Sequence, residues 1–352
     1  MSIRIGSREV GREHRPFVIA EMSGNHAGSL ERALSLVDIA ADAGADAVKL
    51  QTYTADTMTL DVDRDEFRIQ NPQSLWFGRT LHDLYDEAHT PWDWHAPLMQ
   101  RARERGIQCF STPFDTTAVD FLESLDVPCY KIASSENIDI ALIRAVAATG
   151  KPVIISTGLA NFEEVDEAVA AARDAGCTEL VVLKCTASYP ARPEDSNLAT
   201  IAALRDRYAC EIGLSDHTLG TATSVAAVAL GATVLEKHFT ISRTDGAVDS
   251  AFSLEPDELR QLVVETGIAH RSIGAVVLEP TELEQGALTR RRSLYFSADV
   301  RAGEELTPAN VRSIRPGLGL KPKHLEALLG RRAKVDIARG TPTSWDLVAS
   351  DD

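Results

Sequence analysis

The sequence predicts an α/β protein: a (β/α)8 TIM barrel followed by a small β-rich domain. From residue 17 to about residue 274, short apolar runs alternate with longer segments of helical periodicity. Eight such runs in roughly 260 residues match the strand number and length of this barrel. After about residue 284, short strand-like runs are broken by the turns AGEE, PGLG and RGTP. We therefore predict a catalytic barrel domain at 1–280, and a linker with the β-rich domain at 281–352.

Each predicted barrel strand is a short apolar or β-branched run. These runs lie at 17–21, 46–51, 107–111, 129–133, 152–157, 179–185, 210–215 and 232–238. Between the first two, Leu30, Leu34, Val37 and Ala41 share one face of an amphipathic helix. An open doubly wound sheet is the alternative. Against it, the first strand-to-helix turn, EMSGNHAGS, lacks the GxGxxG spacing of that fold.

Composition indicates a cytoplasmic globular protein. Hydrophobic residues make up 44% of the 352 positions, and no apolar run approaches the roughly 20 residues that span a bilayer. The start, MSIRIGSREVGREHRP, lacks the apolar centre of a signal peptide. Five cysteines without a CxxC pair favour reduced thiols. We expect no membrane partner, and the net charge of −16 argues against a nucleic-acid partner.

One strand-to-helix connection, at about 52–91, is unusually long. Loops of this length in compact domains are usually lids or binding loops. Aromatic residues are concentrated in and just after it, although the whole chain is only 6% aromatic: Trp76, Phe77, Tyr85, Trp92 and Trp94. These side chains could cover the face of a sugar or anchor the connection to the barrel.

Polar side chains stand at the end of every predicted strand, where barrels carry their chemistry. They are Glu21, Lys49, Gln51, Ser111, Thr112, Lys131, Ser134, Glu136, Ser156, Thr157, Lys184, Thr186, Ser215, Asp216, His217, Lys237 and His238. Taken singly, such a lysine is more often ion-paired and such a hydroxyl more often a helix cap. Repeated around one mouth, they suit a phosphorylated or carboxylated substrate. We assign proton transfer to Glu21 and Glu136.

His217 and His238 follow two consecutive predicted strands, with the carboxylates Asp216 and Asp249 nearby in the sequence. Parallel strands would place both imidazoles at the same end of the barrel. Two imidazoles with water completing the sphere suit a divalent cation, Mn²⁺ first, with Co²⁺ or Mg²⁺ as alternatives. Zn²⁺ fits less well because no third strong ligand is evident. Such an ion would polarise an aldehyde.

A set of motifs within residues 17–256 resembles the N-acetylneuraminate synthase family. They are IAEMSGNHAGSLERAL, VKLQTYTADTMTLD, FSTPFD, YKIASSE, IISTG, LKCTASYPA, GLSDHTLG, EKHFT and GAVDSAFSLEP. The segment from RRSLY onward resembles the antifreeze-like (SAF) module that closes these synthases. The passages ADTMTLD and LYDEAHTPWDWH are most similar to the pseudaminic acid synthase branch.

The resemblance implies an enzyme that condenses phosphoenolpyruvate with an open-chain amino sugar and releases phosphate. In the pseudaminic branch the acceptor is 2,4-diacetamido-2,4,6-trideoxy-altropyranose and the product is pseudaminic acid. Neuraminate and legionaminate synthases share these motifs and remain alternatives. Two remoter alternatives are a class I aldolase, with Lys131 or Lys184 forming a Schiff base, and a carbohydrate-binding protein without turnover.

The resemblance also assigns roles by motif. Positions that correspond to phosphoenolpyruvate contacts are Lys49, Thr112, Lys131, Ser134, Ser156 and Ser215. Positions associated with catalysis or the acceptor sugar are Glu21, Gln51, Tyr189 and Asp249, and those of the metal ligands are His217 and His238. Arg292 corresponds to an arginine that one subunit extends into its partner's site, although Arg290 and Arg291 stand beside it. This last correspondence implies a domain-swapped homodimer.

Overall fold

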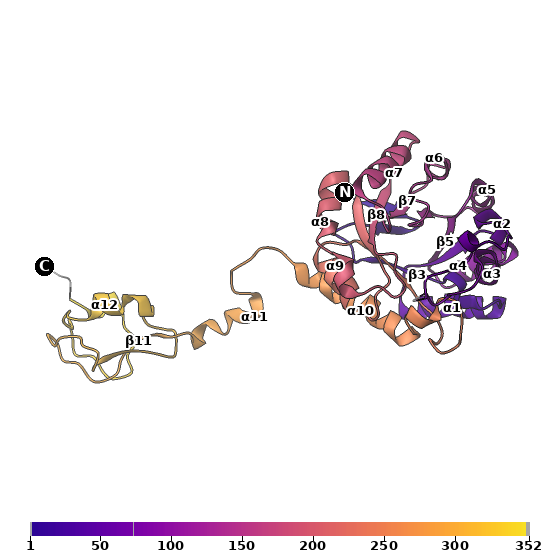
Figure 1. Ribbon diagram of the computed structural model, residues 1–352. Helices are drawn as coiled ribbons and strands as arrows, with labels where there is room; N and C mark the ends of the chain where they lie inside the picture. Colours follow the sequence, from indigo (N-terminus) through magenta and orange to yellow (C-terminus); the bar gives the residue numbers. More distant parts are fainter. Residues whose placement is uncertain (1, 73, 350–352) are drawn as a thin grey trace. The chain divides into compact units, whose positions relative to one another are not determined.

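Eight parallel strands close into a barrel in the computed structural model, which describes residues 2–72 and 74–349. Around the barrel they follow one another in chain order, and the last pairs with the first (Figure 1). The strands are β3 (Phe17–Glu21), β4 (Ala47–Thr52), β5 (Gln108–Pro113), β6 (Tyr130–Ile132), β7 (Val153–Ser156), β8 (Leu180–Cys185), β9 (Glu211–Asp216) and β10 (Val234–His238). Each lies where the sequence predicts a strand, so the predicted TIM barrel is confirmed.

Helices cover the outside of the barrel (Figure 1). They are α1 (Leu30–Ala43), α4 (His95–Glu104), α5 (Thr116–Ser124), α6 (Ile140–Ala147), α7 (Phe162–Asp174), α8 (Thr200–Tyr208), α9 (Ala222–Ala229) and α10 (Pro256–Ile273). Ser29 caps the first of them by accepting a hydrogen bond from the backbone of Arg32. Gly44 ends it at φ 86°, a conformation that favours glycine.

The buried face of α1 differs from the predicted one. Its fully buried positions include Ala33, Leu36 and Ala40, whereas Leu30 and Leu34 are only half-buried at the edge of the core. Alanines at the centre of the contact let a helix lie close to a sheet, and the larger leucines then fill the margin. Val37 is fully buried as predicted. Sequence periodicity therefore identified the helix and one of its inward positions, but it placed the centre of the inner face incorrectly.

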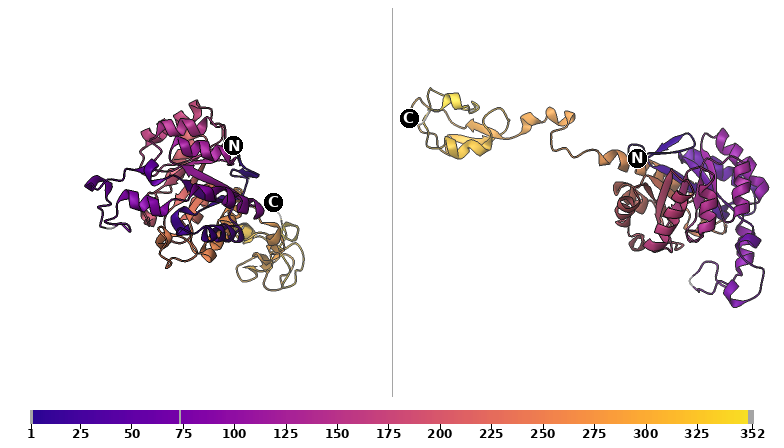
Figure 2. Two further views of the ribbon diagram at one scale, coloured as in Figure 1. Left: turned by 90° about the vertical axis from the view of Figure 1, so that its right-hand side faces the viewer. Right: turned by 90° about the horizontal axis from the view of Figure 1, so that it is seen from above.

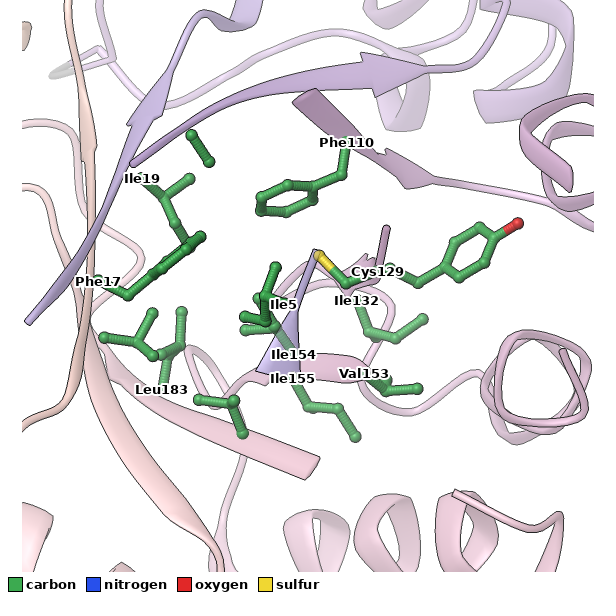
Figure 3. Close-up of a cluster of buried hydrophobic side chains, with 14 of the residues drawn as sticks. Ile5, Phe17, Ile19, Phe110, Cys129, Ile132, Val153, Ile154, Ile155 and Leu183 are labelled. Atoms are coloured by element: carbon green, nitrogen blue, oxygen red, sulfur yellow. The ribbon is translucent and has the colours of Figure 1, made fainter. Parts of the chain in front are cut away.

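Apolar side chains fill the end of the barrel at which the strands begin. An N-terminal hairpin of β1 (Ile3–Ile5) and β2 (Arg8–Val10) precedes the first barrel strand. Its Ile5 is fully buried and lies among side chains of the barrel strands, such as Phe17 and Ile154 (Figure 3). Because hydrocarbon packs this end, the polar side chains of the interior are left for the other end.

The long connection after β4 contains secondary structure of its own. It holds α2 (Ala55–Met58), the short 3-10 helix η2 (Asp65–Phe67), α3 (Leu81–Ala88) and a second 3-10 helix, η3 (Trp92–Trp94). Part of this connection projects away from the barrel (Figure 2). Leu60, Leu75 and Phe77 are exposed in it.

The aromatic residues of this connection divide between the two roles considered for them. The ring of Trp92 stacks on Phe121 of α5 at 4.6 Å between centroids, so it anchors the connection to the barrel. The ring of Trp76 instead lies 6.2 Å from that of Tyr189, a residue assigned to the site. Phe77 remains exposed and does neither.

The chain divides into two compact units, Met1–Gly274 and Ala275–Asp352. The second contains the antiparallel pair β11 (Ser293–Phe296) and β12 (Val311–Ile314), with the short helices α11 (Glu282–Gln285) and α12 (Leu325–Leu328). Its separate core includes Leu294, Phe296 and Leu306. The predicted boundary at 280 and 281 falls in the segment after α10. Among the described residues, no helix has the length and hydropathy needed to cross a bilayer.

Candidate active site

Four charged side chains meet inside the barrel above the apolar layer. Side chains alternate along a strand, so Glu21, Lys49, Lys131 and Glu236 all point inward from four different strands. The Nζ atom of Lys49 lies 2.6 Å from Oε2 of Glu21 and 3.9 Å from Oε2 of Glu236. The Nζ atom of Lys131 lies 4.0 Å from the same Glu236 oxygen. All four are at least 95% buried, so two cations and two carboxylates share a space without bulk water.

Burial and pairing shift these groups in different directions. Burial raises the pKa of Glu21 to about 7, although the charge of Lys49 opposes the shift. Burial would lower the pKa of Lys49, but Glu21 and Glu236 hold it above its usual range. Burial lowers the pKa of Lys131, which has the weaker carboxylate contact. The cluster can therefore hold or release a proton near neutral pH.

Hydroxyl and amide groups surround the lysines. Lys49 donates to Oγ1 of Thr112 at 3.1 Å, and Lys131 donates to Oγ of Ser156 at 2.7 Å. Two other assigned side chains, Ser215 and Gln51, bond to the carboxylates of the cluster, whereas Ser134 bonds to the backbone nearby. Ser215 donates to Glu236 at 3.0 Å, Gln51 donates to Glu21 at 2.8 Å, and Ser134 accepts from the backbone of Gly158 at 3.1 Å.

The two predicted imidazoles lie together at the carboxyl ends of β9 and β10. The ring centroids of His217 and His238 are 5.3 Å apart. Nδ1 of His217 lies 2.9 Å from the carbonyl oxygen of Thr186, which leaves its Nε2 free as a lone-pair donor. Nδ1 of His238 is buried and has no hydrogen-bond partner among the described residues.

This pair fits the predicted divalent cation. Burial, followed by the nearby His217, holds the pKa of His238 well below its usual range, so this ring is neutral as a ligand must be. The pKa of His217 is raised despite burial, because the thiol of Cys185 lies 3.9 Å from its Nδ1. In the described residues no third His, Cys, Asp or Glu joins them in a group that could hold a metal. Water and substrate would therefore complete the coordination.

Aromatic and acidic side chains border the imidazoles. The ring of Tyr189 lies 4.4 Å from that of His217, and the ring of Phe252 lies 5.0 Å from that of His238. Asp249 is buried, lies 3.8 Å from Nδ1 of His238 and accepts a hydrogen bond from Ser23. These side chains form an apolar wall with one polar anchor, an arrangement suited to a sugar.

Glu136 lies just beyond β6, in the connection to α6. Its Oε2 atom is buried and has no hydrogen-bond partner among the described residues. Burial raises its pKa to about 7, while the charge of Lys131 acts in the opposite direction. A carboxyl group with this pKa can both donate and accept a proton at neutral pH.

Glu136→Gln is expected to stabilise the protein at alkaline pH. Folded Glu136 keeps its proton up to pH about 7, whereas the unfolded group loses it near 4.5, so wild-type stability falls as pH rises between these values. Because Glu136 is only half-buried by surface area, we expect a difference of about 1–2 kcal/mol at pH 8 and little at pH 4.5. Urea unfolding at both pH values measures it. The exposed Glu167→Gln serves as the control, and equal effects in both variants would contradict the assignment.

Comparison with known proteins places the chain in a family. Residues 36–277 match the NeuB family, and residues 291–349 match the SAF domain. The chain belongs to the NeuB family. The resemblance drawn from the motifs, including the antifreeze-like module, is thereby confirmed.

Relatives of this NeuB chain cover nearly its whole length. A pseudaminic acid synthase of Campylobacter jejuni subsp. jejuni is 43% identical over 93% of the chain and 95% of its own length. A pseudaminic acid synthase of Helicobacter pylori is 38% identical over 94% and 97%. The crystal structure of an N-acetylneuraminic acid (sialic acid) synthetase from Leptospira borgpetersenii serovar Hardjo-bovis superposes with a TM-score of 0.73. That structure is 34% identical and covers 82% of this chain and 95% of its own.

Three charged residues predicted at the strand ends of this NeuB chain do not face the interior. Lys237 donates to Asp216 at 2.8 Å, and Asp216 also accepts from Ser224 of α9, so this pair lies between barrel and helix. Lys184 donates to Oγ1 of Thr186 and borders a cavity against α7 and α8. Each lies one residue from an inward-facing neighbour, and alternation turns it outward.

Arg292 belongs to the second unit of the NeuB chain, at the start of β11. Its Nη1 atom donates to the carbonyl oxygen of Ser313 on β12 at 2.9 Å, and the residue is exposed.

Glu236 and Cys185 are interior residues that the sequence analysis missed. Glu236 stands two positions before His238 on the same strand, so period-two alternation from the predicted ligand could have found it. Cys185 likewise ends β8 on the inward side and lies beside His217. The sequence analysis instead named the polar residues next to them at the strand ends.

Proposed function

We propose that this chain is a nonulosonic acid synthase that condenses phosphoenolpyruvate with 2,4-diacetamido-2,4,6-trideoxy-altropyranose and water to give pseudaminic acid and phosphate. The observation that carries the proposal is one barrel interior holding a buried lysine pair beside a buried imidazole pair. The relatives named pseudaminic acid synthases at 43% and 38% identity support this choice of acceptor.

The lysine pair is suited to the anionic substrate. Phosphoenolpyruvate carries a carboxylate and a phosphate, and Lys49 and Lys131 supply one point charge for each. Thr112 and Ser156, already bonded to those lysines, add hydroxyl donors that orient the two groups. In an interior without bulk water these contacts are stronger than on the surface. An acidic chain can thus bind an acidic substrate at one focused position.

The imidazole pair is proposed to hold a divalent cation, Mn²⁺ first, with Mg²⁺ or Co²⁺ as alternatives. His217 and His238 would be its ligands, since each presents a nitrogen that no other described group uses. When bound, such an ion polarises the carbonyl of the open-chain sugar. Tyr189 and Phe252 would hold the sugar against this position, with Asp249 as a hydrogen-bond acceptor for it.

The reaction forms one carbon–carbon bond and breaks one carbon–oxygen bond. C3 of phosphoenolpyruvate attacks the aldehyde carbon of the sugar, water adds at C2, and phosphate leaves with the bridging oxygen. A proton must reach the new alkoxide, and another must leave the attacking water. Glu21 and Glu136, with pKa values of about 7, are the proposed proton carriers. Holding both reactants in one barrel supplies much of the acceleration.

Phosphate release with a panel of acceptors tests this function. With phosphoenolpyruvate and Mn²⁺, the purified chain is expected to release phosphate rapidly with the diacetamido-trideoxy-altrose. Release is expected to be at least about tenfold slower with N-acetylmannosamine or the legionaminate precursor, because a misplaced polar group in a closed pocket costs binding. Faster phosphate release with either of these sugars would identify that sugar as the acceptor. No release with any of the three would refute the proposed function. A borohydride-trapped adduct with pyruvate would favour the aldolase alternative.

We also propose a homodimer in which Arg292 of one copy serves the barrel of the other. The support is the motif correspondence and the exposure of Arg292 on a separately folded unit. Arg292→Ala is expected to raise the KM for the acceptor about tenfold, the usual loss for one charge-assisted hydrogen bond. Arg290→Ala and Arg291→Ala are matched controls and should leave this KM unchanged.

A mixing experiment decides whether Arg292 acts across the dimer. Equal amounts of the His217→Ala and Arg292→Ala chains are unfolded, refolded together and assayed. The assay uses an acceptor concentration well below the wild-type KM, where the Arg292→Ala chain alone keeps about a tenth of wild-type activity. If Arg292 reaches its partner's barrel, half of the dimers are mixed and each has one intact site, so the mixture shows at least about a quarter of wild-type activity. If Arg292 served its own barrel, no site would be intact, and the mixture would show only about a twentieth.

A further inference from the structure

A polar cavity of about 490 Å³ lies at the end of the barrel opposite the candidate active site. It is bordered by the segment after β2, the turn between α9 and β10, and the last turn of α10. Its lining includes Arg12, Glu13, His14, Thr233, His270 and Arg271. The five residues of β10 separate Thr233 from the end of the strand at His238, a span of about 16 Å at 3.3 Å per residue.

The two arginines that line the cavity form no ion pair with another described residue. Arg12 and Arg271 are exposed, and neither has an ion pair or hydrogen bond to another described residue. The arginines before and after Arg12 in the sequence do form ion pairs. Arg8 and Arg15 both lie within 2.9 Å of the carboxylate of Asp46. Two unpaired guanidinium groups thus border one hollow of a chain whose net charge is −16.

A third guanidinium is held beside the cavity by a glycine. Arg205 of α8 donates to the carbonyl oxygen of Gly231, which lines the cavity. Gly231 has φ 95°, and a Cβ atom there would lie 2.9 Å from both terminal nitrogens of Arg205. Only glycine allows this close approach. Burial, and then the charge of Arg12, lowers the pKa of Arg205, so these two cations repel each other.

Several negative charges and partial charges also lie near the cavity. The C-terminal ends of α9 and α10 reach the cavity, and each contributes roughly half a negative charge. Glu13 is the one carboxylate in the lining. The charges of Glu211 and Asp206 also act on Arg205. Arg12 and Arg271 are therefore the guanidinium groups beside the cavity that form no ion pair with another described residue. His14 already lies 3.3 Å from Glu9.

We propose that this cavity binds a phosphorylated small molecule. Guanidinium groups recognise phosphate through paired N–H donors, and Arg12 and Arg271 have all of theirs available. The volume exceeds that of a phosphate group and lies in the range of small-molecule sites, so it also accommodates the organic part of the ligand. The site is independent of the chemistry at the barrel mouth, because no residue is shared.

Titration with inorganic phosphate tests the site in solution. Calorimetry on the wild-type chain should show a phosphate site, separate from any binding at the barrel mouth, that Arg12→Ala/Arg271→Ala removes or weakens at least about tenfold. The matched control Arg105→Ala/Arg260→Ala removes the same charge from the outer surface and should change nothing, since both of these arginines are paired with aspartates. Equal phosphate binding in the wild-type chain and the Arg12/Arg271 variant would overturn the proposal.

Crystals of the full chain soaked with tungstate locate the site directly. Tungstate is a tetrahedral oxyanion like phosphate, and its anomalous scattering identifies it. A peak between Arg12 and Arg271 in wild-type crystals, absent from the double variant, is the expected result. Tungstate found only at the barrel mouth, or only against a lattice neighbour, would refute the site. Neither measurement uses enzyme activity, so failure here is distinct from failure of the proposed function.

Discussion

His217→Ala is expected to lower turnover about a thousandfold and to abolish its dependence on a divalent cation. Removing one of the two proposed protein ligands would leave His238 alone, and a single imidazole is too few ligands for tight binding of Mn²⁺. Polarisation of a carbonyl by a metal is worth several kcal/mol, and each 1.36 kcal/mol corresponds to a factor of ten in rate. Steady-state phosphate release, before and after EDTA treatment and with Mn²⁺ added back, measures the effect. His238→Ala should behave in the same way.

The control for this prediction is His89→Ala, which removes an imidazole that forms a hydrogen bond with the backbone of Asp86, outside the site. This variant should keep wild-type turnover and restoration by Mn²⁺. Metal content after dialysis gives a readout apart from rate, and only the site variants should lose the ion. Wild-type turnover in His217→Ala, or full retention of the metal by this variant, would contradict the metal assignment. A large loss of unfolding free energy in His217→Ala would be a separate, structural effect.

Lys131→Met is expected to be both inactive and unstable, and a second substitution separates the two effects. The ammonium group of Lys131 lies 4.0 Å from Glu236 in a fully buried cluster. Its loss leaves two buried carboxylates facing one lysine, which is expected to cost about 3 kcal/mol of stability. The double variant Lys131→Met/Glu236→Gln restores the charge balance and should recover most of that stability. Urea unfolding measures this recovery.

Activity should not return with stability. If Lys131 binds phosphoenolpyruvate, the double variant still lacks one point charge for the substrate, and its KM should remain at least about a hundredfold above wild type. Glu236→Gln alone is the matched control and keeps both lysines. Recovery of normal kinetics in the folded double variant would show that Lys131 serves the fold rather than the substrate.

Local patterns were sufficient to predict the elements and the end of the barrel that carries chemistry. Every barrel strand lies within two residues of its predicted position, because apolar runs and caps act over a few residues. The predicted ligands His217 and His238 do meet, with ring centroids 5.3 Å apart. Equivalent positions on adjacent parallel strands are neighbours once the strands pair, so this contact followed from topology.

The inward or outward direction of individual side chains was harder to predict. Asp216 was expected among the polar side chains at the barrel mouth, yet it pairs with Lys237 on the helix side of the sheet. In both strands the histidine faces inward, and the residue just before it therefore faces outward. Glu236 was also missed, because it lies two residues before the end of its strand. It nevertheless contacts both lysines of the cluster.

By itself, the sequence determined the order of strands and helices, the β-rich second unit and the family, because periodicity, turn residues and motifs are properties of short segments. Only the tertiary structure decided which charges share the interior and which pair outside it. Barrel closure brings together residues as distant as Ser23 and Asp249, 226 positions apart, and no local pattern encodes such a contact. The balance of two lysines against two carboxylates, on which substrate binding is proposed to depend, exists only after that closure.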